Sequence, residues 1–317
     1  ERFPDAEVTI LEQGKKVLAK VSISGGGRCN LTHHCFDPNL LVRNYPRGEK
    51  ALLKPFMRFG PTETIEWFSK RGVKTKVEAD GRMFPVTDSS QTIIDCLMNA
   101  CKRNNVKIKL GSKVVDINLS EENGKPHNVR LLNGVEHEAD ILFVGAGSSM
   151  TIWKILQNRG MEIVSPVPSL FTFKINDARL KGLSGITLNS VGLSIPGTSH
   201  VSDGPMLITH KGLSGPAILK LSARAAHHFH SCNYNCKLKI DFRPDVSEKE
   251  IKTWRDTEAK KLMGNHTVLG LPRRMAAQLL SIAELDGQKK FATLSKVEMQ
   301  KLIDLLKKST FQIEGQN

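Results

Sequence analysis

The sequence has 317 residues, 39% of them hydrophobic and 25% charged, and its 46 Lys and Arg against 32 Asp and Glu give a net charge of +14. This composition is typical of a globular protein and excludes a disordered chain. A chain of this length exceeds one compact core, so we expect two or three domains. No apolar run reaches the ~18–20 residues of a membrane span, and the first residues do not form a signal peptide. With six scattered cysteines, these features predict a cytoplasmic protein without a membrane partner.

The positive charge is spread along the chain, with only short pairs such as Lys15-Lys16 and Lys289-Lys290. Nucleic-acid binders usually concentrate their charge in a stripe or tail, and only two tyrosines are available for base stacking. We therefore disfavour a nucleic-acid partner and attribute the charge to a solvated surface or to attraction of an anionic cofactor. A basic, non-enzymatic module that binds RNA or another polyanion is the alternative.

The first strong pattern is a β-branched and apolar run at residues 8–11, which ends on Glu12. It predicts a buried parallel strand with an acid at its carboxyl end. In a dinucleotide-binding fold such an acid accepts hydrogen bonds from the adenosine ribose; an ordinary surface Glu is the alternative. The Gly-x-Gly-x-x-Gly fingerprint, expected roughly 20 residues before the acid, is missing. Either the fold differs, or its first strand and turn are absent from this chain.

A glycine-rich stretch follows at residues 24–30 and consists of Ser24, Gly25, Gly26, Gly27, Arg28, Cys29 and Asn30. Successive glycines let the backbone lie close against a ligand. Arg28 offers a planar cation for phosphate, and Asn30 adds a donor and an acceptor. The stretch therefore predicts a ligand loop, with a flexible surface turn as the alternative.

Patterns of apolar residues and turn signals predict the remaining helices and strands of this half of the chain. We expect a helix at 62–71, a strand pair within 74–86, a helix at 90–103 capped by Ser89, strands at 106–110, 113–117 and 128–132, an apolar strand at 140–144, and a helix at 151–159. The apolar strand leads into Gly145, Ala146 and Gly147. A glycine turn between strand and helix is a second place where backbone can approach a phosphate.

A change of composition near residue 166 predicts a domain boundary, with β-rich sequence beyond it. There, residues 204–210, which end on His210, predict a turn followed by a strand, and Ser214 can cap a helix whose first turn holds Pro216. Helices are expected at 247–263, 272–285 and 295–308, followed by a short strand.

One dense His/Cys group lies between the strands and these helices and comprises His227, His228, His230, Cys232 and Cys236. Its Cys-x-x-x-Cys spacing could hold zinc, but no second pair at a standard spacing follows. We therefore predict a solvent-side loop and no metal.

Four passages together resemble bacterial NAD(P)/FAD-dependent oxidoreductases of the aminoacetone-oxidase-like and bile-acid-reductase-like type: residues 11–12, 24–32, 166–173 and 207–216. The resemblance covers nearly the whole chain. It implies an α/β fold with an incomplete Rossmann-like FAD-binding domain at 1–165, an inserted β-rich domain at 166–245, a helical module at 246–309, and the start of a return to the FAD domain at 310–317. Family members also carry the N-terminal fingerprint and a later FAD-contacting segment, so the chain looks truncated at both ends, and we expect weak FAD binding.

The resemblance also implies an activity and a site. It implies two-electron transfer through FAD, with NAD(P)H as donor and a small-molecule substrate. Glu12 would bind the adenosine ribose, residues 24–30 would line the FAD site with Arg28 near the pyrophosphate or flavin, Val114 would contact adenine through its backbone, and residues 145–147 would close the far side. It names no catalytic acid or base; Cys29 and His210 are the candidates from chemistry alone. An inactive truncated paralogue is a further alternative.

Overall fold

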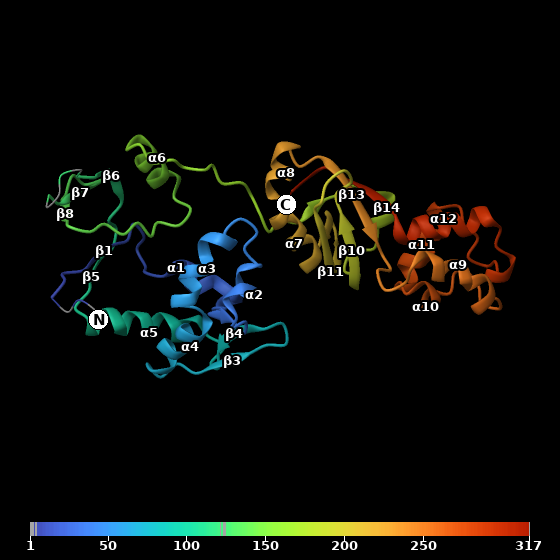
Figure 1. Cartoon of the computed structure of the whole chain (residues 1–317), viewed down its shortest axis with the longest axis horizontal. Coiled ribbons are helices and arrows are strands. Elements are labelled where there is room, and N and C mark those ends of the chain that lie inside the picture. The colour runs from blue at the N-terminus through green and yellow to red at the C-terminus, as the bar shows by residue number, and fades with distance from the viewer. Residues whose placement is uncertain (1–2, 4, 121, 123–124, 317) are drawn as a thin grey trace. The chain divides into compact units, whose positions relative to one another are not determined.

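The computed structural model describes residues 3, 5–120, 122 and 125–316. The chain divides into two compact units, Glu1–Ser165 and Pro166–Asn317, and both contain helices and strands (Figure 1). Within the described residues, none of the helices has the length and apolar character that crossing a bilayer would require.

The first unit is a series of short elements. They are β1 (Thr9–Leu11), α1 (Ala19–Ile23), the 3-10 turn η1 (Ser24–Gly27), β2 (Thr32–His33), α2 (Pro38–Val42), α3 (Glu49–Arg58), α4 (Pro61–Ser69), β3 (Thr75–Val77), β4 (Arg82–Pro85), α5 (Ser90–Arg103), β5 (Lys107–Lys109), β6 (Val114–Asn118), β7 (His127–Leu131), β8 (Glu136–Ala139) and α6 (Met150–Asn158).

The described strands of this unit form three small sheets. β1 pairs with β5 in parallel, while β2-β4-β3 and β6-β7-β8 are antiparallel. The predicted strand pair within 74–86 is confirmed as β3 and β4. So is the cap of α5, because the Ser89 side chain accepts a hydrogen bond from the Gln91 backbone N–H. Local sequence therefore determines much of this unit.

Two strand predictions in the first unit need correction. β1 forms where expected, but it is not buried, since Val8 and Ile10 are 45% and 42% exposed. Residues 140–144 form no strand, and Ile141 and Phe143 are 87% and 91% exposed. The composition of this apolar run predicts burial, but among the described residues no neighbouring strand pairs with it.

The second unit begins with strands and ends mainly with helices. Its elements are β9 (Phe173–Lys174), η2 (Ala178–Leu180), β10 (Thr187–Ser194), β11 (Val201–Thr209), β12 (Gly212–Ser214), α7 (Pro216–Arg224), α8 (Ala226–Ser231), β13 (Cys236–Asp241), α9 (Glu248–Thr257), α10 (His266–Leu269), α11 (Arg273–Ile282), η3 (Phe291–Thr293), α12 (Lys296–Lys307), β14 (Ser309–Ile313) and β15 (Gly315–Gln316).

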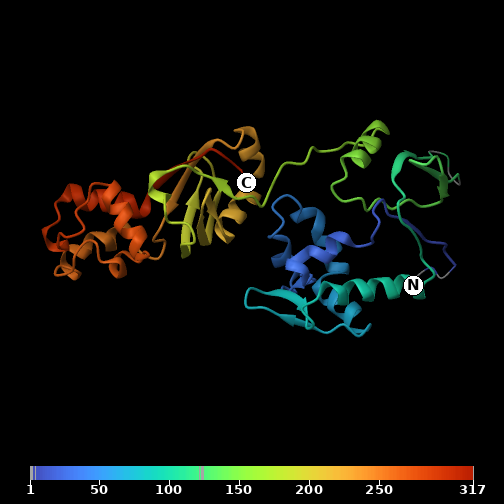
Figure 2. The same cartoon turned by 180° about the vertical axis from the view of Figure 1, so that it is seen from behind.

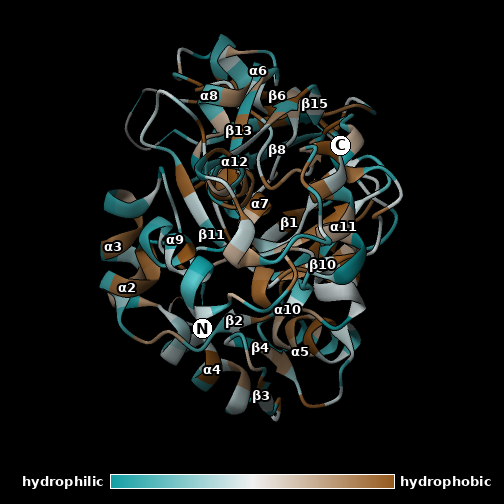
Figure 3. Ribbon diagram, turned by 90° about the vertical axis from the view of Figure 1, so that its right-hand side faces the viewer, coloured by the Kyte–Doolittle hydropathy of each residue, from teal (hydrophilic) through white to brown (hydrophobic). Residues whose placement is uncertain are grey.

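One seven-stranded antiparallel sheet organises this unit, in the order β14-β13-β10-β11-β12-β9-β15. Helices α9 to α12 gather on one side of the sheet in both views (Figures 1 and 2). A continuous hydrophobic core runs from Phe171 to Ile313 and contains residues of the sheet and of these helices. The helices carry both hydrophobic and hydrophilic residues (Figure 3), as expected for helices with one buried face. Sheet and helices therefore pack as one body.

The last strands extend this same sheet. β14 pairs with β13, and β15 pairs with β9. Residues 309–316 therefore lie in the second unit, whereas the sequence led us to expect a return to the first domain from residue 310. Their partners lie far away in the sequence, so a local pattern gives no indication of this pairing.

The start of α7 differs from its prediction. Ser214 lies in β12, and Gly215, with φ 98°, is the N-cap residue; Pro216 is in the first turn as expected. A Cβ at Gly215 would lie 3.0 Å from backbone atoms of Pro205, Met206 and Leu207. The turn therefore requires glycine because it packs against β11.

Candidate functional site

The glycine stretch forms a left-handed turn at the end of α1. Gly25, Gly26 and Gly27 have φ values of 55°, 70° and 84°, a region that glycine enters without a steric cost. A Cβ on Gly25 would lie 2.6 Å from the Asn30 backbone nitrogen and 2.9 Å from the Phe84 ring, whereas a Cβ on Gly26 would meet nothing within 4 Å. Gly25 is thus packed against the protein. Gly26 lies beside open space, where a ligand such as a phosphate group can approach.

Arg28 is held by a network of opposite charges. Its Nη1 donates to Glu78 Oε1 at 2.5 Å and lies 3.5 Å from Asp88 Oδ1, and its guanidinium lies 4.0 Å from the centroid of the Phe84 ring. The hydrogen bond to Glu78 raises the pKa of Arg28. In turn, Asp88 binds Lys76, which lowers the pKa of that carboxyl. The guanidinium therefore fixes the loop to the β-sheet that carries Phe84.

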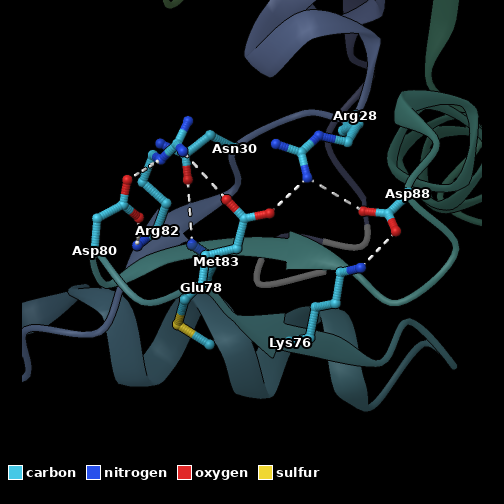
Figure 4. Close-up of polar contacts among 8 residues, drawn as sticks. All are labelled: Arg28, Asn30, Lys76, Glu78, Asp80, Arg82, Met83 and Asp88. Carbon is cyan, nitrogen blue, oxygen red and sulfur yellow. Dashed lines mark hydrogen bonds and ion pairs between the residues drawn. The ribbon is translucent and has the colours of Figure 1, made fainter. Parts of the chain in front are cut away.

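The complete network is charge-balanced (Figure 4). It comprises three cations and three carboxylates: Arg28, Lys76, Arg82, Glu78, Asp80 and Asp88. Asn30 completes it, since its Oδ1 accepts from the Met83 backbone N–H at 3.2 Å. Sequence reasoning missed the three acids; the alternation of charges between residues 74 and 88 was their signal. Because the charges balance, Arg28 offers less attraction to a pyrophosphate than its sequence position suggested.

Glu12 follows β1, at the carboxyl end of the parallel strand pair. Its Oε1 accepts from the Gly14 backbone N–H at 2.6 Å. The backbone of Glu12 also bonds to Ser112, and that of Gly14 bonds to Gly111. These bonds hold the Glu12 turn against the segment that immediately precedes Val114, the first residue of β6. The structure therefore brings the predicted ribose-binding acid and the predicted adenine-contacting strand into one neighbourhood.

The second glycine turn, Gly145, Ala146 and Gly147, is exposed and leads to α6. Gly147 has φ 58°, and a Cβ there would lie 2.9 Å from Lys20 Nζ. Lys20 lies in α1, directly before the glycine stretch. The turn therefore lies close to the helix before the glycine stretch, beside a lysine that sequence reasoning did not identify.

The two candidate catalytic residues lie in different surroundings. Cys29 is 7% exposed and packs with Phe68, Val73 and Ile93, so it has the position of a core residue. His210 is exposed in the turn between β11 and β12 of the second unit. Neither belongs to the network around Arg28.

The profile of the HI0933-like protein Rossmann domain matches residues 2–305. The chain belongs to this family. Membership in the HI0933-like family confirms the Rossmann-like α/β fold and, with a reductase among the relatives, the resemblance to flavin-dependent oxidoreductases.

Three curated relatives of the HI0933-like chain show 25–27% identity. Two are named ribosomal RNA dihydrouridine synthase: the Escherichia coli protein, 27% identical over 88% of this chain and 68% of its own length, and the Haemophilus influenzae protein, 26% identical over 94% and 74%. The third, from Clostridium scindens, is named 3-dehydro-bile acid delta(4,6)-reductase and is 25% identical over 99% and 78%.

A solved structure of BexE, from a study of oxidation during BE-7585A biosynthesis, has a TM-score of 0.31 and 14% identity. This chain spans 41% of that structure, and 68% of this chain is covered. A similarity this low supports no conclusion about fold or function.

Proposed function

We propose that this protein is a flavin-dependent reductase that uses FAD and NAD(P)H to add two hydrogens across a carbon–carbon double bond. The family match over residues 2–305 carries the proposal. The names of the relatives support the reaction type, because both "dihydrouridine synthase" and "delta(4,6)-reductase" describe reduction of a double bond. A flavin supplies two-electron chemistry when it is bound, and the protein positions it.

The residues of the first unit are suited to holding such a cofactor. Gly26 leaves open space beside left-handed backbone, which lets a large planar or phosphorylated group come close. Glu12 follows a parallel strand, the position from which a carboxylate accepts ribose hydroxyls. Gly147 and the nearby Lys20 add a second glycine turn with a cation that can face an anionic group. Arg28 holds the loop in place through Glu78.

For the substrate we favour a uracil base within structured RNA. Two relatives are named for ribosomal RNA, and a net charge of +14 suits attraction of a polyanion. This departs from our expectation of a small-molecule substrate. A small conjugated ketone is the second candidate, since the Clostridium scindens relative is named for a bile acid.

The reaction can be tested with ribosomal RNA from cells that lack the gene. We expect the protein, FAD and NADPH or NADH to increase the dihydrouridine content of the RNA, measured by mass spectrometry of the nucleosides. Nicotinamide oxidation that depends on a steroid dienone but not on RNA would favour the second candidate. Salt-sensitive RNA binding without any flavin binding or nicotinamide oxidation would overturn the reductase proposal and favour a binding module.

The cofactor site can be tested separately with Glu12→Gln. Loss of a charged hydrogen-bond acceptor should weaken FAD binding about tenfold to a hundredfold, measured by flavin fluorescence titration. Glu138→Gln, in the exposed part of β8, removes an acid of the same unit and should leave the affinity unchanged. Equal affinities of wild type and Glu12→Gln would remove Glu12 from the site.

A further inference from the structure

Three metal-ligating side chains meet in the second unit, at the junction between α8 and β13. The ligand atoms of His228, Cys232 and Cys236 all lie within 4.8 Å of one another, and each side chain is half-buried. None of these residues belongs to the flavin site described above.

The backbone explains how the three side chains come together. His228 and Cys232 are four residues apart along α8 and its C-cap, so they lie on one helical face. The chain then reverses through Asn233 and Tyr234, which both have positive φ (50° and 57°). This reversal places Cys236 at the start of β13, beneath the end of the helix.

Rigid packing holds these positions. Phe229 in α8 and Leu238 in β13 are 0% exposed and belong to the hydrophobic core. The Tyr234 backbone N–H donates to the Phe229 carbonyl at 2.7 Å, and Cys236 pairs with Ile313 of β14. The ligands are therefore carried by elements that the core already fixes.

We propose that His228, Cys232 and Cys236 form a zinc site that fastens α8 to β13. Two thiolates and one imidazole suit tetrahedral Zn²⁺, with Zn–S of about 2.3 Å and Zn–N of about 2.0–2.1 Å. With tetrahedral angles, those bond lengths place the three ligand atoms roughly 3.5–3.8 Å apart, so side-chain rotation from the observed spacing is sufficient. Water can take the fourth position; the His200 ring, with its centroid 5.9 Å from that of His228, is the nearby side chain that can replace it.

The sequence disfavoured a metal because no second pair at a standard spacing followed the two cysteines. The third ligand instead precedes them by four residues on the helix. The spacing is His-x-x-x-Cys-x-x-x-Cys, and the turn after α8 is what brings Cys236 close to the other two ligands.

Cobalt(II) is the probe, because a thiolate bound to tetrahedral Co²⁺ gives a charge-transfer absorption and visible d–d bands. The whole protein is reduced, freed of metal and titrated with Co²⁺ without oxygen. We expect one equivalent to give these bands and Zn²⁺ to abolish them. Cys232→Ser and Cys236→Ser should lose the bands, and His228→Asn should weaken Co²⁺ binding at least about tenfold. Cys101→Ser, which removes a half-buried cysteine of the first unit, is the matched control and should behave like wild type.

Absence of the bands in the reduced wild-type protein would overturn the proposal, as would bands that persist in the Cys232→Ser/Cys236→Ser double variant. A second measurement does not depend on how the variants fold. One equivalent of Zn²⁺ should raise the Tm of the wild-type protein, and a chelator should reverse the rise. A Tm that does not respond to Zn²⁺ would count against the site.

Discussion

At the scale of single residues, Gly25 and Gly26 show how neighbours in one turn differ in what they require. Both have positive φ, which costs an L-residue about 1–2 kcal/mol. Only Gly25 is also packed, since a Cβ there would overlap the Asn30 nitrogen and the Phe84 ring. Packing therefore fixes Gly25, whereas access for a ligand is the feature of Gly26.

Alanine at these two positions should separate the two roles. We expect Gly26→Ala to lower the free energy of unfolding by about 1 kcal/mol, and Gly25→Ala to lower it by about 2–4 kcal/mol because overlap is added to strain. Urea unfolding measures both. Gly26→Ala should nevertheless weaken FAD binding, because the added methyl group enters the open space. Equal losses of stability would contradict this difference in packing.

At the scale of elements, β4 supports the glycine loop, because Phe84 of β4 packs against Gly25 and Arg28. This ring is 0% exposed, and the Arg28 guanidinium lies over it. The small antiparallel sheet thus supports the loop, and Glu78, just after β3, and Asp88, just beyond β4, bind its arginine.

Truncation of this ring should destabilise the loop and the sheet together. Phe84→Ala is expected to cost about 3–5 kcal/mol, whereas Phe84→Leu keeps most of the volume and should cost less than about 1.5 kcal/mol. Urea unfolding of both variants checks this order. If alanine were tolerated as well as leucine, Phe84 would not be the support of the loop.

The first turn of α12 is held by the side chain of Glu298. Glu298 accepts from Lys289 Nζ at 2.6 Å and from the Ser295 backbone at 2.9 Å. The hydrogen bond from Lys289, followed by those from Ser295, lowers the Glu298 pKa from 4.5 to about 2. A lowered folded-state pKa stabilises the protein above the unfolded value, and this contribution is lost as pH falls through the folded value.

Glu298→Gln should therefore lower the urea midpoint by a constant amount between about pH 5 and pH 7. The difference from wild type should shrink as the pH falls from about 4.5 towards 2, because the wild-type carboxyl then takes up its proton. In a Lys289→Gln background the substitution should have a smaller effect at neutral pH, since the main partner is gone. A difference that does not vary with pH would exclude this ion pair as its source.

Sequence patterns predicted most helices and the cap at Ser89, because these depend on residues a few positions apart. They also predicted the acid after β1 and the glycine turn. They could not predict that Arg28 pairs with Glu78, 50 residues away, or that β14 joins β13, because such pairings depend on the tertiary fold. Residues 140–144 were misjudged because an apolar run has the same composition whether it is buried or exposed.

At the scale of the whole molecule, the two units differ in how continuous their sheets and hydrophobic cores are. The second has one sheet and one continuous core. The first has three small sheets and separate small clusters of buried residues. Since hydrophobic burial is the main stabilising contribution, stability should be concentrated beyond residue 165.

A fragment of residues 166–317 should fold by itself, because it contains every strand of its sheet and the residues of its core. We expect one cooperative thermal transition, within about 5 °C of the matching transition in the whole protein. Calorimetry of the fragment and of the whole chain compares them. A fragment without a cooperative transition would show that the second unit depends on the first.

The parallel pair β1 and β5 has a practical consequence. In the described part of the chain it has no third strand, so each strand presents a row of backbone N–H and C=O groups along its outer edge. Val8 and Ile10 are exposed beside this edge. Any extended peptide can add there by backbone hydrogen bonding. We therefore expect slow, sheet-mediated association at high concentration to begin at the first unit, and Ile10→Lys to reduce it, as measured by light scattering over time.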